Sequence, residues 1–211
     1  MREVTRDTID GFERITLSSD SVEIQVLPAL GAKITSLLHR PTGRQWMWTA
    51  RANPRYRPVP TGALFDQGTL VGADECLPTI EPCRWRGLEL TDHGEVWTEA
   101  WELDEIETDR GRIATTVRTP ISPLRFSRVL SLDRNVIRFD YALTSEEPFE
   151  YIWAFHPLMT IEAGDRIELS PTCQQVCTEL CLGGCPLGVR GDRWQWPNPQ
   201  PAIDLSRYDL G

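Results

Sequence analysis

Residues 22–26 read VEIQV, and this stretch determines the fold class that the rest of the chain is expected to have. Apolar and polar residues alternate strictly, which places the apolar side chains on one face of a half-buried strand. Residues 137–141, IRFDY, repeat the pattern. Similar short runs occupy residues 12–17, 96–103, 112–118, 126–132 and 149–155, several of them separated by turn-forming residues.

Helical periodicity is not sustained anywhere, and the 15 Gly and 16 Pro are spread along the 211 residues, where they break helices. The sequence therefore predicts an all-β fold of antiparallel sheets in one domain covering residues 1–211. Residues 50–60, ARANPRYRPVP, contain three prolines and are expected to form an extended loop that could rim a cleft.

The overall composition limits which partners the protein can bind and in which compartment it is expected. A net charge of −9 argues against an extended nucleic-acid surface, and a neutral small molecule fits better. No apolar run approaches the roughly 20 residues that span a bilayer, and the first residues lack the apolar region of a secretory signal. We therefore expect a soluble, cytoplasmic protein without membrane contact, in which the six cysteines are free thiols.

Two of the three histidines have surroundings that favour a catalytic role. His93 lies in the turn-like segment DHGEVW, residues 92–97, where Glu95 and Trp97 are candidate sugar contacts and a solvated surface turn is the alternative. His156 ends the apolar run YIWAFHP, residues 151–157, next to an apolar wall, and a core histidine bonded to a carbonyl explains the same pattern. His39 precedes a turn and is given no role.

A pair of carboxylates in residues 72–80, GADECLPTI, forms a further candidate site. Asp74 and Glu75 interrupt an otherwise apolar, turn-rich segment and could accept hydrogen bonds from sugar hydroxyls, although a solvated loop is equally compatible. Cysteines recur at every fourth residue in Cys173, Cys177, Cys181 and Cys185, a row whose thiolates could bind zinc. The spacing differs from that of paired zinc ligands, so no metal site is assigned.

Three segments, in this order, resemble the aldose 1-epimerase (galactose mutarotase-like) family, and especially its bacterial branch: residues 72–80 (GADECLPTI), 92–97 (DHGEVW) and 153–158 (WAFHPL). Residues 27–34, LPALGAKI, are similar to the opening of that family. The resemblance implies a β-supersandwich of two large antiparallel sheets with a carbohydrate cleft. It also implies anomer interconversion of an aldose or hexose derivative without a cofactor or metal.

By this resemblance His156 would protonate the ring oxygen and His93 would orient the substrate. The general base of the family is a glutamate near the C-terminus, and the segment ending in SRYDLG has no match to it. Either the final strands are absent, or another carboxylate such as Glu75 or Glu95 replaces that base. Missing strands would expose sheet edges, which favours a homo-oligomer.

Three hypotheses of function follow from these residues. The first is an isomerase of the aldose 1-epimerase type. The second is a non-catalytic carbohydrate-binding protein with a degenerate cleft, which the unmatched glutamate favours. The third is a structural or regulatory protein whose cysteine row binds a metal.

Overall fold

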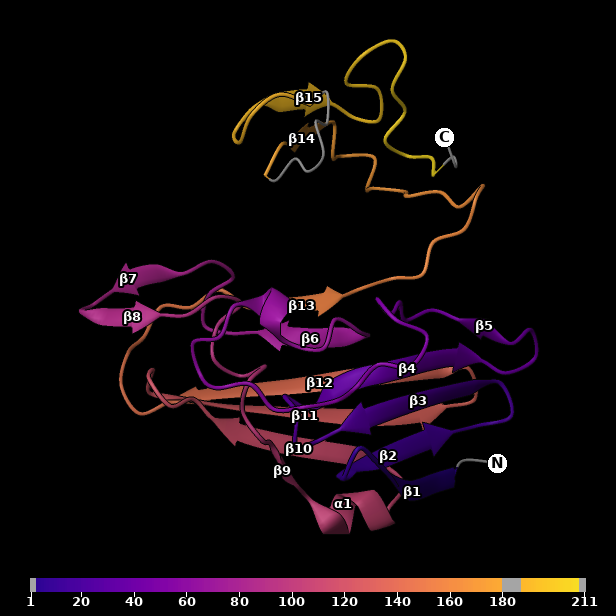
Figure 1. Cartoon of the computed structure of the whole chain (residues 1–211), viewed down its shortest axis with the longest axis vertical. Coiled ribbons are helices and arrows are strands. Elements are labelled where there is room, and N and C mark those ends of the chain that lie inside the picture. Colours follow the sequence, from indigo (N-terminus) through magenta and orange to yellow (C-terminus); the bar gives the residue numbers. More distant parts are fainter. Residues whose placement is uncertain (1–2, 180–186, 209–211) are drawn as a thin grey trace. The chain divides into compact units, whose positions relative to one another are not determined.

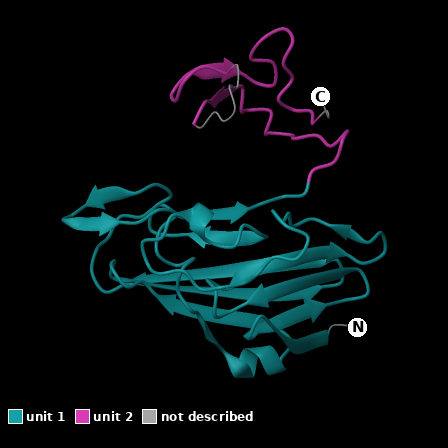
Figure 2. Ribbon diagram, viewed as in Figure 1, with its two compact units in different colours: residues 1–160 teal, residues 161–211 magenta. Residues whose placement is uncertain are grey.

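A computed structural model describes residues 3–179 and 187–208 of the chain. Contacts within the chain divide it into two compact units, Met1–Thr160 and Ile161–Gly211 (Figure 2). The prediction of a single domain over residues 1–211 stays a prediction beside this division.

The first unit is built from two antiparallel sheets (Figure 1). The larger sheet has seven strands in the order β1-β2-β3-β4-β6-β13, with β5 paired to β4. Its strands are β1 (Glu3–Ile9), β2 (Phe12–Ser18), β3 (Val22–Leu27), β4 (Lys33–His39), β5 (Arg44–Gln45), β6 (Ala73–Cys76) and β13 (Ala154–Pro157). The smaller sheet has the order β12-β11-β10-β9, formed by β12 (Val136–Ser145), β11 (Leu124–Asp133), β10 (Ile113–Arg118) and β9 (Glu102–Leu103).

The hydrophobic core lies between these two sheets. Ile15 and Ile24 from the larger sheet join Phe126 and Leu130 from the smaller one in a single cluster of buried residues. Along β11 the buried and less buried side chains alternate almost perfectly, as a strand with one face in the core requires. The all-β prediction, with its two main antiparallel sheets, is confirmed.

Most of the predicted strands are present, and two are largely absent. Residues 96–98 form a turn and residues 99–101 are irregular rather than a strand. The indole N–H groups of Trp97 and Trp101 bond the nearby carbonyls of Asp92 and Val96, each at 2.9 Å. Residues 149–153 also lie outside any strand, and β13 begins only at Ala154.

The remaining elements of the first unit are short. The strands β7 (Cys83–Trp85) and β8 (Leu88–Leu90) form a hairpin, and η1 (Phe65–Gln67) is a 3₁₀ turn. The helix α1 (Glu105–Asp109) begins after Asp104, whose side chain accepts a hydrogen bond from the Glu107 amide. Among the described residues, no helix is long and apolar enough to cross a membrane.

The second unit contains one small hairpin. β14 (Gln175–Cys177) pairs with β15 (Arg193–Gln195), so that Val176 lies opposite Trp194. The Trp194 indole N–H donates to the Thr178 hydroxyl at 2.9 Å, which ties the hairpin to the following turn.

Candidate functional site

The pairing of β6 with β13 separates the two carboxylates of the Asp74-Glu75 dipeptide. Asp74 lies opposite His156, and Glu75 lies opposite Phe155. Because successive side chains of a strand point to opposite faces, Asp74 and His156 share the outer face of the larger sheet. Glu75 instead faces the interior between the sheets, where it accepts hydrogen bonds from residues of β11 and β12.

His93 is held in a strained turn beside this face. Its backbone has a φ of 56°, in the left-handed region that is uncommon for a residue with a side chain. The following Gly94 has a φ of 75°, and a Cβ atom there would lie 2.2 Å from the Leu77 carbonyl oxygen. The His93 amide donates to the Ile80 carbonyl at 2.8 Å. These contacts fix the turn against residues 77–80, which directly follow β6.

Asp92 fixes the orientation of the His93 ring. Its Oδ1 atom lies 2.9 Å from His93 Nδ1, and its Oδ2 atom accepts from the Phe65 amide at 2.8 Å. An ionised carboxylate only accepts hydrogen bonds, so Nδ1 of His93 is the donor. The other ring nitrogen, Nε2, is then the one left to act on a ligand.

Aromatic rings gather around the two histidines. The His93 and His156 ring centroids lie 5.0 Å apart with planes inclined by 74°. Phe65 stacks on His93 at 4.2 Å and meets the edge of His156 at 5.0 Å. The ring of Trp97 approaches Phe65 at 5.3 Å. The cluster of His93, His156, Phe65 and Trp97 is therefore a compact, largely apolar wall that carries two titratable groups.

A buried ion pair lies beside the histidines. Lys33 Nζ contacts Asp74 Oδ2, and both side chains are more than nine-tenths buried. Asp74 Oδ1 and His156 Nδ1 are buried and have no hydrogen-bond partner among the described residues. These two atoms therefore lack the partner that a buried polar atom normally has. Burial, and then the positive charge of a protonated His93, lower the pKa of His156.

Glu75 is placed away from this cluster. It is completely buried, and its carboxylate accepts from Arg128 Nη1 at 2.9 Å, from the Tyr141 hydroxyl at 2.8 Å and from the Trp153 indole at 2.9 Å. The prediction that Glu75 contacts a sugar stays a prediction, and this internal position does not favour it.

Glu95 is likewise fully buried and bonded within the protein. Its carboxylate accepts from the amides of Ile121 and Ser122 at 2.7 and 3.2 Å. Burial raises the pKa of Glu95. The side chain thus anchors the turn at residues 121–122, and a role in sugar contact stays a prediction without support from this geometry.

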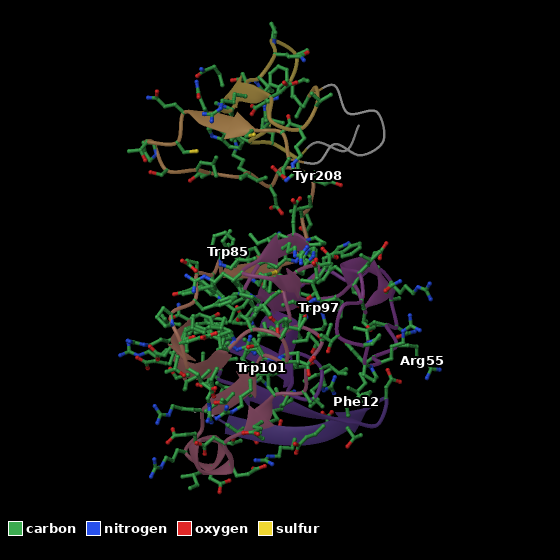
Figure 3. The ribbon with its side chains drawn as sticks, turned by 90° about the vertical axis from the view of Figure 1, so that its left-hand side faces the viewer. Phe12, Arg55, Trp85, Trp97, Trp101 and Tyr208 are labelled. Atoms are coloured by element: carbon green, nitrogen blue, oxygen red, sulfur yellow. The ribbon has the colours of Figure 1, made fainter. Side chains whose placement is uncertain are left out.

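Trp97 lies at the cluster but is nearly inaccessible. Trp97 is 4% exposed, as is Trp101, and both are labelled in Figure 3. The indole N–H is occupied by the Asp92 carbonyl. Trp97 therefore packs against Phe65, and little of its ring is left exposed for stacking on a sugar.

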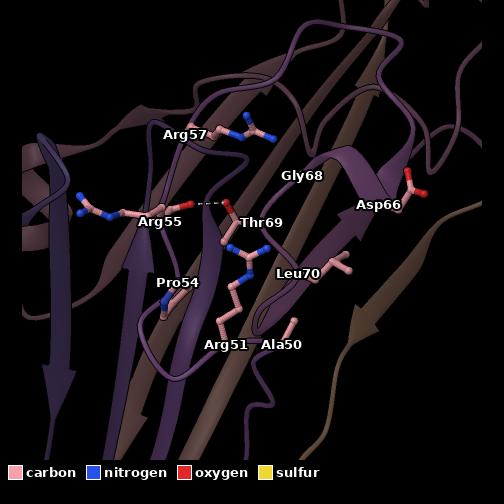
Figure 4. A pocket seen from close by; sticks show the side chains of 9 residues that line it. All are labelled: Ala50, Arg51, Pro54, Arg55, Arg57, Asp66, Gly68, Thr69 and Leu70. Carbon is pink, nitrogen blue, oxygen red and sulfur yellow. Dashed lines mark hydrogen bonds between the residues drawn. The ribbon is translucent and has the colours of Figure 1, made fainter.

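The predicted loop at residues 50–60 does rim a hollow. A cavity of about 490 Å³ is lined by the loop, by Asp66 and by residues 68–70 (Figure 4). Figure 4 shows the Arg51 and Arg57 side chains at this cavity, whereas the Arg55 guanidinium points away from it and is ion-paired with Asp10. A smaller space, which shares Arg57 with this cavity, is also lined by Lys33 and Trp97.

The cysteine row is only partly described. Cys181 and Cys185 lie outside the described residues, whereas Cys173 and Cys177 are free thiols in the second unit. Within residues 3–179 and 187–208, no group of three or more His, Cys, Asp or Glu side chains is arranged to hold a metal.

Sequence reasoning identified both histidines and Asp74 but missed three of their neighbours. Asp92 adjoins a chosen histidine, and its position beside an imidazole is a usable signal. Lys33 in β4 could have been inferred as the counter-ion of a buried aspartate. Phe65 reaches the site through a loop, and nothing in the local sequence indicates it.

Comparison with known proteins bears on the fold alone. No family model matches the chain, and no curated protein matches it. Among solved structures, a 4-alpha-glucanotransferase from Thermococcus litoralis is similar over 92% of this chain and 32% of its own length, with 15% identity and a TM-score of 0.56. A structure described as a "putative mutarotase (YeaD)" from Salmonella typhimurium covers 60% of this chain at 15% identity and a TM-score of 0.41.

This chain spans well under half the length of both solved proteins, 42% of the Salmonella protein and 32% of the Thermococcus enzyme. The chain therefore shares an all-β fold with the matching part of the glucanotransferase.

Proposed function

We propose that this chain binds an aldose or a related hexose derivative and interconverts its α and β anomers by acid–base ring opening. The observation that carries the proposal is the pairing of His93 and His156, whose ring centroids lie 5.0 Å apart on a largely apolar wall. Two imidazoles at this separation can supply one proton donor and one proton acceptor near neutral pH.

The chemistry needs few groups. The base removes the proton from the anomeric hydroxyl while the acid protonates the ring oxygen, so that the C1–O5 bond breaks and C1 becomes a carbonyl carbon. Rotation about the C1–C2 bond and reclosure then give the other anomer. A positioned acid or base each contributes on the order of 10²–10⁴-fold. The unpartnered oxygen of Asp74 is a candidate acceptor for a sugar hydroxyl.

Exchange NMR on glucose and galactose tests this function. Catalysed interconversion should be lost by about 10²-fold or more in His156→Gln and His93→Gln. It should be unchanged in His39→Gln, because His39 lies at a turn and bonds Thr42. If the intact chain leaves the anomers of these sugars and their derivatives interconverting at the uncatalysed rate, the proposed enzymatic function is wrong.

A second function has its own support. Glu75 and Glu95, the two carboxylates that could replace the glutamate expected from the aldose 1-epimerase resemblance, are occupied by protein donors. A non-catalytic carbohydrate-binding protein needs no base, and Asp74 with the aromatic wall would still recognise a ring. Saturable sugar binding without any acceleration of anomer exchange would establish this alternative.

A further inference from the structure

The smaller sheet ends in an unpaired strand edge. β12 is the outermost strand of this sheet, and its ten residues pair with β11 alone. Within residues 3–179 and 187–208, no strand or isolated bridge pairs with the other edge of β12. Such an edge presents a row of N–H and C=O groups that can hydrogen-bond to another chain. We propose that two copies of this chain form a dimer in which β12 pairs antiparallel with β12 of the second copy.

The other outer strands are less suited to this pairing. β13 ends at Pro157, which has no N–H to donate, and β9 has only two residues. β1 adjoins α1, since Arg6 forms an ion pair with Glu105. β12 contains no proline or glycine and follows β11 without a bulge. It therefore lacks the short length, the proline and the bulge by which proteins commonly protect an exposed edge.

The core-facing side of β12 is incompletely covered. On β11 the side chains that point between the sheets are buried, whereas the four on β12 from Ile137 to Leu143 are only partly buried. Beside them, a cavity of about 390 Å³ is lined by Leu37 and Trp46 as well as Ile137 and Phe139. A second copy that extends the sheet would remove this apolar edge from water, which favours association.

The charges of β12 select one register for the pairing. In a twofold dimer of antiparallel strands, the two copies of one central residue lie opposite each other. Centring β12 on Phe139 places Arg138 opposite Asp140 of the second copy, and Asp140 opposite its Arg138. Both side chains are exposed on the outer face of the sheet, so each contact joins opposite charges. Centring the pairing on Arg138 or on Asp140 would instead place like charges opposite each other.

The same register suits the apolar face of the strand. Phe139 lies opposite Phe139 of the second copy, and Ile137 lies opposite its Tyr141, which are favourable cross-strand pairs. Leu143 of the second copy lies opposite Asn135, which lines the cavity beside β12. One arrangement thus pairs the charges on the outer face and covers the apolar groups on the inner face.

Charge reversal on β12 tests the dimer and its register in one set of variants of the full chain. Arg138→Asp places two aspartates opposite each other at both contacts, and Asp140→Arg places two arginines there. Each should raise the dimer dissociation constant by about 10-fold to 100-fold, measured by sedimentation equilibrium. The double variant Arg138→Asp/Asp140→Arg restores opposite charges and should regain the dimer. An equal mixture of the two single variants should form a heterodimer.

The mixture separates a contact between chains from a role within one chain. Arg138 Nε bonds both carboxylate oxygens of Asp140 in the same strand, at 2.8 and 3.0 Å, and both single variants break this contact. Mixing cannot restore a bond within either chain, so a recovered dimer reports pairing between chains. Circular dichroism of each variant shows whether its strands remain formed.

Arg118→Asp is the matched control, because Arg118 is exposed on β10, which β11 separates from β12. It should leave the dissociation constant unchanged. A monomeric intact chain at tens of micromolar would overturn the proposal, as would a dimer that both charge reversals leave as tight as before. If the intact chain dimerises but the mixed variants stay apart, the pairing centred on Phe139 is wrong.

Discussion

Glu75 and Arg128 form an ion pair that is closed off from solvent, with exposed fractions of 0% and 1% and an Nη1–Oε1 distance of 2.9 Å. The pair joins β6 of the larger sheet to β11 of the smaller one, and Tyr141 of β12 bonds the same carboxylate. Burial and the adjacent negative charge of Glu75 raise the pKa of the Tyr141 hydroxyl. This buried network ties the two sheets together at the level of the candidate site.

Removing one partner of this pair should destabilise the fold strongly. We expect Glu75→Leu to lower the free energy of unfolding by about 3–5 kcal/mol, since Arg128 would remain buried without its counter-charge. The double variant Glu75→Leu/Arg128→Met should recover much of that loss. Urea denaturation measures both, and Arg118→Met, which breaks an exposed pair with Glu146, is the control. Equal stability of the Glu75 and Arg118 variants would contradict this account.

Gly94 should tolerate no side chain. An added Cβ would approach the Leu77 carbonyl carbon to 2.4 Å as well as its oxygen, and a φ of 75° is itself strained for other residues. Gly94→Ala should therefore displace His93 and lower the melting temperature. Gly43→Ala is the matched control, because its φ of 70° is similar but a Cβ there meets open space. Thermal unfolding that shifts equally in both variants would show that the contact with Leu77 is relieved cheaply.

The lowered pKa of His156 predicts a loss of stability in mild acid. Burial disfavours the charged ring in the folded state, so the unfolded state binds the proton first as the pH falls through about 6.5. The free energy of unfolding should decrease below that pH and level off once the folded ring also titrates. His156→Gln should remove this contribution. Denaturation at about pH 7.5 and pH 5 measures it; parallel losses in the wild type and the variant would refute it.

Cys76 should be an unreactive thiol. Burial and the nearby carboxylates of Asp74 and Glu75 raise its pKa to about 12, and the thiolate is the form that reacts. Cys83 is exposed and provides an internal comparison. Iodoacetamide labelling of the folded chain near pH 8, followed by mass spectrometry, should modify Cys83 first by a factor of about 10² or more. Comparable labelling of Cys76 would indicate that β6 opens readily.

The strands that sequence alone located are those whose signal is local. The alternation in β3 and β12 follows from each strand having one face in the core, and it can be counted without knowing the partner strand. Residues 96–101 and 149–153 are equally apolar but are not strands. The segment at residues 96–101 is held by indole bonds that reach only five residues back, to Asp92 and Val96. The segment at residues 149–153 is held by bonds from the Ile152 amide to Pro78 and from the Trp153 indole to Glu75, which are distant in sequence.

The residues of the candidate site also differ in whether the sequence alone could identify them. His93 and His156 could be chosen because imidazole is scarce in this chain and chemically distinctive. That Asp74 faces the histidines while Glu75 faces the core follows from the register of β6 against β13, which composition does not specify. The stacking of Phe65 on His93 depends on the path of a loop between Gly62 and Gly68. No local pattern encodes that path.

The opposed directions of Asp74 and Glu75 have a consequence for protein engineering. One peptide bond links a carboxylate that stabilises the interior to a carboxylate beside the histidines, so a selection for heat tolerance acting on the Glu75 network would also alter the face that carries the candidate site. Variants of this strand should therefore show correlated changes in melting temperature and in whatever binding or activity the candidate site has. A library designed to improve one property while holding the other constant would do better to leave β6 unaltered and diversify the loops around it.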